Sequence, residues 1–172
     1  MSAIALMRST RRLRKLELGC GGGVDAAHMI SRGFDVDPTD GVAEMAATAE
    51  QRLNRDVRVM RFDELAAVET FDAVIANASL LQVPTEGLLE IFARIWAALR
   101  PGGWHFATFK TGAASGYDRH GRYYNYFSRT EAKAHYRDAG DWTLIDFDEW
   151  PGTGYFSEPA MWLKVIARKA LA

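Results

Sequence analysis

The segment Glu17-Leu18-Gly19-Cys20-Gly21-Gly22-Gly23 decides the fold, because it joins an apolar run to a stretch with helical periodicity. The apolar run Leu13–Leu18 predicts the first strand, and a helix is predicted from the glycines to about Ser31. Glycine is needed where a ligand presses on the backbone or where φ is positive. The free N–H groups at a helix start favour a negative group. This stretch therefore predicts a strand–loop–helix unit that binds a ligand.

Beyond this unit, short apolar runs alternate with helical segments, which predicts an α/β fold with a parallel sheet covered by helices on both faces. The other predicted strands are Phe34–Thr39, Val57–Phe62, Phe71–Ala76, Trp104–Phe109, Trp142–Phe147 and Met161–Ala167. The other predicted helices begin at Val42, Pro84 and Ser128 and end near Leu53, Leu99 and Gly140. The connection Pro151–Gly154 is too short for a crossover helix, so the last two strands are expected to be antiparallel to each other.

The composition predicts one globular domain over residues 1–172, with a short lead-in of about residues 1–12. The 172 residues are 48% apolar and 25% charged, with a formal net charge of −1. This charge favours neither nucleic acid nor an anionic membrane as a partner, and no apolar stretch approaches the roughly 18 residues that span a bilayer. The arginines near the N-terminus are interpreted as a solvated lead-in. The single cysteine, Cys20, excludes an internal disulfide and is consistent with a cytoplasmic protein.

Asp40 is the second part of the predicted ligand site, because it lies 21 positions beyond Gly19 at the end of the next strand. A carboxylate there can accept both hydrogen bonds of a ribose diol. Two other interpretations remain open from the residues alone. The spacing Gly21-x-Gly23-x-x-Ala26 formally fits a dinucleotide fingerprint, and Asp40 could simply cap the helix that follows it.

Four motifs in order resemble class I S-adenosylmethionine-dependent methyltransferases, and the overall resemblance extends from about Lys15 to Arg168. The motifs are Glu17–Gly23, Phe34–Met45, Phe71–Ile75 and Leu99–Gly103. The segments Ala78–Pro84 and Gly121–Tyr126 resemble, more narrowly, the tellurite-resistance-like methyltransferases. The resemblance implies a three-layer Rossmann-like fold with a seven-stranded, mostly parallel sheet and an antiparallel last strand. It also implies S-adenosyl-L-methionine as the cofactor.

The resemblance further implies a set of cofactor-binding residues. The glycine loop, with Glu17 nearby, would hold the methionine end, and Asp40 would bind the ribose hydroxyls. Asp63 would bind the adenine amino group beside Phe62. The complete predicted set is Glu17, Gly19, Cys20, Gly21, Gly23, Asp40, Gly41, Phe62, Asp63, Asn77 and Ala78.

The segment after the fifth strand is expected to form the wall that faces the methyl acceptor, a small molecule. It lies at the carboxyl end of the sheet, where open α/β folds bind ligands, and it combines aromatic rings with cations. The predicted acceptor-binding residues are Lys110, Arg119, Arg122, Tyr123, Tyr124 and Tyr126. Gln82 and Tyr124 are the candidate catalytic residues, although Gln82 stands where histidine is common in the family and cannot exchange a proton as histidine does.

Three functions are compatible with the sequence. The first is methyl transfer to a small molecule, and the alternatives are nicotinamide-dependent oxidoreduction and cofactor binding without catalysis. The four histidines show no ligand spacing, so no metal is expected. The short lead-in leaves three possibilities open: the pocket is open, another subunit covers it in a homo-oligomer, or the chain is shortened.

Overall fold

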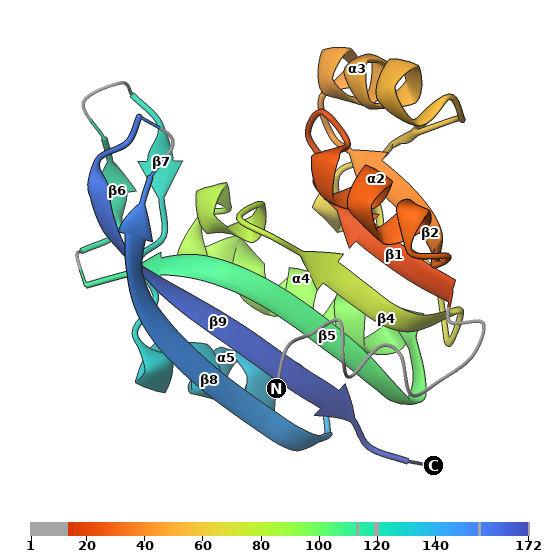
Figure 1. Ribbon diagram of the computed structural model, residues 1–172. Helices are drawn as coiled ribbons and strands as arrows, with labels where there is room; N and C mark the ends of the chain where they lie inside the picture. The colour runs from red at the N-terminus through yellow and green to blue at the C-terminus, as the bar shows by residue number, and fades with distance from the viewer. Residues whose placement is uncertain (1–13, 113, 119–120, 155, 172) are drawn as a thin grey trace.

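A seven-stranded sheet forms the centre of the computed structural model, which describes residues 14–112, 114–118, 121–154 and 156–171 (Figure 1). The strand order across the sheet is β3-β2-β1-β4-β5-β9-β8. The strands are β1 Arg14–Leu18, β2 Asp35–Asp40, β3 Arg58–Val59, β4 Phe71–Ala76, β5 Leu99–Thr111, β8 Trp142–Thr153 and β9 Pro159–Lys169. A separate hairpin consists of β6 Gly116–Tyr117 and β7 Tyr123–Tyr124. The predicted lead-in lies outside the described residues.

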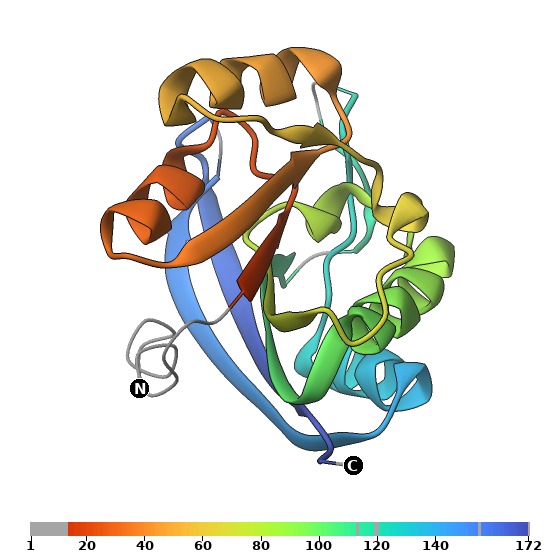
Figure 2. The ribbon, with the colours of Figure 1, turned by 90° about the vertical axis from the view of Figure 1, so that its right-hand side faces the viewer.

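Helices cover both faces of this sheet, which confirms the predicted three-layer α/β fold. Figure 2 shows α2 and α3 on one side and α4 and α5 on the other. The helices are α2 Val24–Ser31, α3 Ala43–Leu53, α4 Thr85–Ala98 and α5 Arg129–Ala139, with short 3-10 turns η1 Phe62–Glu64 and η2 Leu80–Gln82.

Strand direction places the ligand-binding edge. The neighbouring strands β1, β2, β3, β4 and β5 pair in parallel, whereas β9 is antiparallel to both β5 and β8. This confirms the predicted antiparallel last strand. Because β5 and β8 are both antiparallel to β9, they run in the same direction. The strand β8 therefore ends at the same edge of the sheet as β5. The β8–β9 turn therefore lies beside the carboxyl ends of the parallel strands, where ligands bind in open α/β sheets.

The larger core lies between the sheet and the pair α4 and α5. Leu88, Phe92 and Ile95 recur along one face of α4 and are fully buried, as the helical spacing predicts. The Phe92 ring stacks on Tyr136 at 4.5 Å between centroids and meets Phe109 edge-on at 6.3 Å. These contacts fix α4 and α5 against β5.

The start of α5 confirms the predicted capping box. Ser128 Oγ accepts a hydrogen bond from the Glu131 N–H at 3.2 Å, and Glu131 Oε2 accepts one from the Ser128 N–H at 2.9 Å. These reciprocal bonds satisfy N–H groups that a helix start leaves without partners.

Three predicted boundaries need correction. The third strand is only Arg58–Val59, because the apolar residue Phe62 packs on the core from a 3-10 turn and not from a strand. The strand β5 starts at Leu99, and its Pro-Gly-Gly segment forms an irregularity opposite Phe71–Ala73. The strand β8 extends to Thr153, into the segment predicted as the connection.

Gly140, directly after α5, tests this packing. A Cβ there would lie 2.5 Å from Trp96 Cγ, and the Trp96 ring is held by its Nε1–H donating to the Asp141 carbonyl at 2.9 Å. We expect Gly140→Ala to lower the free energy of unfolding by about 1–3 kcal/mol, the usual cost of overpacking, as measured by urea denaturation. Gly116→Ala is the matched control, because no atom lies within 4 Å of its Cβ position. Equal midpoints for the two variants would contradict the packing argument.

Candidate active site

The loop after β1 turns through three glycines in the left-handed region: φ is +72° at Gly19, +54° at Gly21 and +76° at Gly23. Gly19 also has no room for a side chain, since its Cβ would lie 2.5 Å from Ser79 Cβ and 3.3 Å from Phe62 Cζ. The loop therefore presents bare backbone at the carboxyl edge of the sheet, as its sequence predicts.

Asp40, at the end of β2, ties this loop to the start of α3. Its Oδ2 accepts a hydrogen bond from the Gly21 N–H at 2.8 Å, and its Oδ1 accepts one from the Val42 N–H at 2.9 Å. The capping interpretation of Asp40 is wrong, because the N-cap of α3 is Val42 and no side chain caps that helix. An ionised carboxylate has about four acceptor positions, so two remain for a ligand hydroxyl.

Glu17 is the buried acid of the site. Its side chain comes from β1, the residue is 2% exposed, and its Oε2 has no hydrogen-bond partner among the described residues. Burial, followed by the nearby charges of Asp25 and Asp40, raises the pKa of Glu17 to about 7. A cation bound here would relieve both the burial cost and the repulsion. The residues present therefore fit the ammonium group of the expected cofactor.

Asn77, after β4, joins three elements at the same edge. Its Nδ2 donates to Asp25 Oδ2 on α2 at 2.7 Å, and its Oδ1 accepts from Thr108 Oγ1 on β5 at 2.7 Å. Thr108 Oγ1 also accepts the Ala78 N–H at 2.8 Å, where Ala78 has a φ of +51°. The sequence analysis did not predict Asp25 or Thr108 as site residues. Asp25 could have been noticed as an acid in the first turn of the helix that follows the glycine loop.

Cys20 is a buried thiol inside the loop. Burial raises the pKa of Cys20 to about 12, and the charges of Glu17 and Asp40 add to this shift. The thiol is therefore not ionised near neutral pH, and its buried side chain fills space inside the loop.

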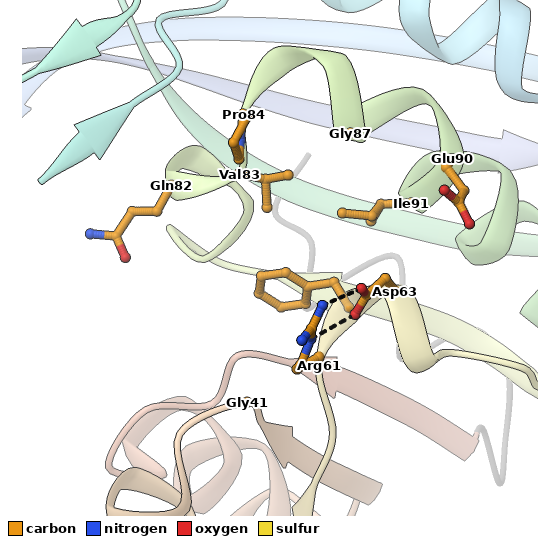
Figure 3. A pocket seen from close by; sticks show the side chains of 10 residues that line it. Gly41, Arg61, Asp63, Gln82, Val83, Pro84, Gly87, Glu90 and Ile91 are labelled. Atoms are coloured by element: carbon orange, nitrogen blue, oxygen red, sulfur yellow. Dashed lines mark hydrogen bonds and ion pairs between the residues drawn. The ribbon is translucent and has the colours of Figure 1, made fainter.

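A pocket of about 430 Å³, here called the Phe62 pocket, opens between the loops after β2 and β3 and the start of α4. Its lining residues are Gly41, Arg61, Phe62, Asp63, Gln82, Val83, Pro84, Gly87, Glu90 and Ile91. Figure 3 shows the carboxylate of Asp63 paired with the Arg61 guanidinium across two hydrogen bonds. This pairing lowers the pKa of Asp63. A ligand amino group would therefore share Asp63 with Arg61.

Gln82 lies at the rim of the Phe62 pocket, and its side chain extends away from the other labelled residues (Figure 3). Tyr124, the other candidate catalytic residue, is 4% exposed and lines a different pocket. The structure thus does not bring the two candidates into one pocket.

The second pocket, here called the Lys110 pocket, has a volume of about 340 Å³ and is enclosed by the end of β5, the β6–β7 hairpin and the β8–β9 turn. Its lining residues are Lys110, Asp118, Arg122, Tyr124, Tyr126, Phe156 and Glu158. Four predicted acceptor-binding residues are among them. Tyr123 instead packs edge-on against Tyr117, with 5.5 Å between ring centroids, and Arg119 lies outside the described residues.

Asn125 fixes the position of the Lys110 pocket relative to β4. It is fully buried, and its Nδ2 donates to the carbonyls of Leu80 and Val83 at 2.8 and 2.7 Å. Its own N–H donates to the Leu81 carbonyl at 2.8 Å. The tyrosines on either side of Asn125 are thereby held next to η2. The sequence motif Gly121–Tyr126 pointed to this segment without showing the contact.

The described residues offer neither a metal site nor a membrane-spanning helix. They contain no group of three His, Cys, Asp or Glu side chains placed to hold a metal ion. Within the same part of the chain, every helix is too short or too polar to cross a bilayer.

Comparison with known proteins assigns the class. Residues 16–103 match the methyltransferase domain family, and the chain belongs to that family. A SAM-dependent methyltransferase from Methanosarcina mazei has the same fold over 100% of this chain and 99% of its own, with a TM-score of 0.88 at 17% identity.

Two further relatives are more similar in sequence. The 1,6-didemethyltoxoflavin-N1-methyltransferase of Burkholderia thailandensis, solved with that compound and S-adenosylhomocysteine, is 25% identical with a TM-score of 0.78. The alignment covers 98% of this chain and 76% of that one. The ubiquinone biosynthesis O-methyltransferase of Burkholderia cenocepacia is 32% identical over 101 residues, which are 54% of this chain and 42% of the relative. The chain spans about half the length of the curated relatives it matches.

The family match and the shared fold confirm the predicted methyltransferase fold, and neither supports the nicotinamide alternative. The strand order of the sheet also argues against a dinucleotide-binding fold. That fold has the order 3-2-1-4-5-6 and is built from two parallel halves. Here the strand next to β5 is β9, which is antiparallel to it.

Glu17 makes the stability of the ligand-free protein depend on pH. A carboxyl group whose folded-state pKa is raised stabilises the fold fully below its unfolded value of 4.5, and this contribution is lost as the pH rises through about 7. We therefore expect Glu17→Gln to match the wild type near pH 4 and to be more stable by about 3 kcal/mol at pH 8, since one pKa unit corresponds to 1.36 kcal/mol. Urea denaturation at both pH values measures this difference. A difference that does not change with pH would show that Glu17 does not have a raised pKa.

Proposed function

We propose that this protein transfers a methyl group from S-adenosylmethionine to a small-molecule acceptor. The observation that carries the proposal is the buried Glu17 Oε2, which has no hydrogen-bond partner in the described part of the chain and lies near other carboxylates beside a loop of bare backbone. When bound, the cofactor supplies an electrophilic methyl group on a sulfonium. The protein then has mainly to bind and orient the two reactants, so no catalytic triad is required.

In this proposal, the residues at the carboxyl ends of β1, β2 and β4 hold the cofactor. The glycine loop receives the methionine carboxylate on its N–H groups, and Glu17 and Asp25 face the ammonium group. Asp40 accepts the ribose hydroxyls with its remaining lone pairs. The other members of the proposed set are Gly41, Phe62 and Asp63 around the adenine, and Asn77 and Ala78 beneath the reacting end.

The Lys110 pocket is proposed to hold the acceptor. It lies at the same edge of the sheet as the glycine loop, and its lining includes Tyr124, Tyr126 and Phe156. The relatives support a small acceptor, because one of them binds 1,6-didemethyltoxoflavin and another is an O-methyltransferase of ubiquinone biosynthesis. The segments Ala78–Pro84 and Gly121–Tyr126 support membership of the tellurite-resistance-like group, without making a tellurium compound the acceptor.

Gln82 is proposed to contact the cofactor side and not the acceptor, because it lies on the rim of the Phe62 pocket. An exposed amide at this position also favours the second candidate function, a protein that binds the cofactor without transferring methyl groups. A cytoplasmic location, self-association and the absence of nucleic-acid substrates remain predictions from the sequence.

Calorimetric titration with S-adenosylhomocysteine tests the cofactor site. We expect saturable binding to the wild type and binding about 5- to 150-fold weaker to Asp40→Asn, the equivalent of the 1–3 kcal/mol of a lost charged hydrogen bond. Asp37→Asn is the matched control, because Asp37 lies on the same strand and pairs with Arg58 at 3.0 Å, away from the loop. Thermal unfolding checks that both variants fold.

Three outcomes would contradict the proposal: no binding of S-adenosylhomocysteine, equal affinity in the two variants, or tighter binding of NADH. Transfer of a labelled methyl group to a panel of phenols and nitrogen heterocycles then separates an enzyme from a protein that only binds the cofactor.

A further inference from the structure

Lys110 is a buried cation at the wall of the Lys110 pocket. Its side chain is 5% exposed, and its Nζ donates to Glu158 Oε1 at 3.0 Å. The ammonium also lies 4.4 Å from the centroid of the Tyr124 ring and 5.9 Å from that of Trp162. An ammonium has three donors, and Glu158 is its single hydrogen-bond acceptor within the described part of the chain. Donor capacity therefore remains on a cation that borders a cavity.

The ion pair is poorly suited to stabilising the fold. The Glu158 side chain is 39% exposed, so half of the pair is in water and half is buried. Such a pair gains little, while removal of the ammonium from water costs several kcal/mol. Glu158 does order the turn, because its Oε2 accepts the Phe156 N–H at 2.9 Å and its backbone carbonyl accepts the Gly154 N–H at 2.7 Å. Neither contact requires a lysine.

Arg122, the other cation of this pocket, is engaged differently. Its Nε and Nη2 donate to the same carboxylate oxygen of Asp118 at 3.0 and 2.7 Å. Its guanidinium lies 4.6 Å from the Phe156 ring centroid and 5.3 Å from that of Tyr124. Arg122 thus lies against the aromatic rings that line the pocket, and it forms an ion pair with Asp118.

The pocket can accept a ring of ordinary size. A cavity of 150 Å³ is known to hold benzene, and the Lys110 pocket has about 340 Å³. Aromatic walls favour flat ligands through offset or edge-on contacts. The charged residues that line this cavity are Lys110 with Glu158 and Arg122 with Asp118, and Tyr124 and Tyr126 also line it.

We propose that the acceptor is a phenol or an enol on a flat ring, bound in its ionised form with its oxyanion on the Lys110 ammonium. This inference rests on the proposed function and specifies its substrate class. The O–H group of the acceptor releases its proton to solvent when it binds, and the resulting oxygen carries the electron pair that a methyl acceptor needs. The buried cation compensates the negative charge, and the aromatic wall aligns the ring.

Titration of 4-nitrophenol bound to the full chain tests this proposal, because its ionised form absorbs visible light. With S-adenosylhomocysteine present, we expect the wild type to lower the pKa of the bound probe by about one unit, a tenfold preference for the ionised form. Lys110→Met should abolish the shift, and Lys110→Arg should keep part of it. Lys164→Met is the matched control, because Lys164 makes a similar ion pair with Asp148 at 2.9 Å on the adjacent strands β9 and β8; it should leave the shift unchanged.

Glu158→Gln separates ligand binding from a purely structural role. If Lys110 binds the oxyanion, the Glu158 carboxylate competes with the probe for the ammonium group. The probe bound to Glu158→Gln should then have a pKa as low as, or lower than, the probe bound to the wild type. If Lys110 serves only to anchor the turn, Glu158→Gln and Lys110→Met should lose probe binding equally, which would overturn the proposal.

Other results of the probe titration would also contradict the proposal. An unshifted probe in the wild type, no probe binding, or displacement of the probe by inorganic phosphate more readily than by unsubstituted phenol would each contradict an oxyanion on a flat ring. Probe binding without binding of S-adenosylhomocysteine would instead refute the proposed function alone, since the probe titration can be repeated without the nucleoside.

Discussion

The electrostatic repulsion among three carboxylates near one glycine loop is the constraint on which the rest of the site depends. Glu17 is buried with an unpartnered oxygen, and the charges of Asp25 and Asp40 act on it. Asp40 accepts hydrogen bonds from two backbone N–H groups, whereas burial and the neighbouring charges raise the pKa of Glu17. The ligand-free site is therefore strained electrostatically, and a bound cation relieves it. This relief is the basis of the proposed preference for a ligand that carries an ammonium group.

The topology of the sheet supplies the second half of the site. Because β9 is antiparallel to β5 and β8, the β8–β9 turn returns to the carboxyl edge, where Glu158 meets Lys110 at the end of β5. Asn125 connects the neighbouring hairpin to η2 through three backbone contacts. One part of the edge is thus acidic and built on β1, β2 and β4, and the other is aromatic with a buried cation. This division is consistent with two different ligands meeting between them.

Local patterns in the sequence were sufficient to predict most helices and strands and the glycine-loop side of the candidate site. The glycine loop and Asp40 could be predicted because their roles depend on backbone conformation and on strand ends. The third strand was predicted too long because Met60 is buried and Phe62 partly buried within an irregular segment, and apolar spacing does not distinguish such a segment from a strand. Glu158 and Phe156 could not be predicted, because Glu158 reaches Lys110 across 48 positions of sequence. Asp25 was missed for a similar reason, since its partner Asn77 lies 52 positions away.

Proton release upon cofactor binding is the most direct measure of the central claim. Calorimetry of S-adenosylhomocysteine binding at pH 7, in buffers with different ionisation enthalpies, counts the protons exchanged. Since the pKa of Glu17 is raised to about 7 in the ligand-free protein, the ammonium should expel about half a proton from the wild type and none from Glu17→Gln. The same number of protons for both proteins, or binding heats that do not depend on the buffer, would contradict the account.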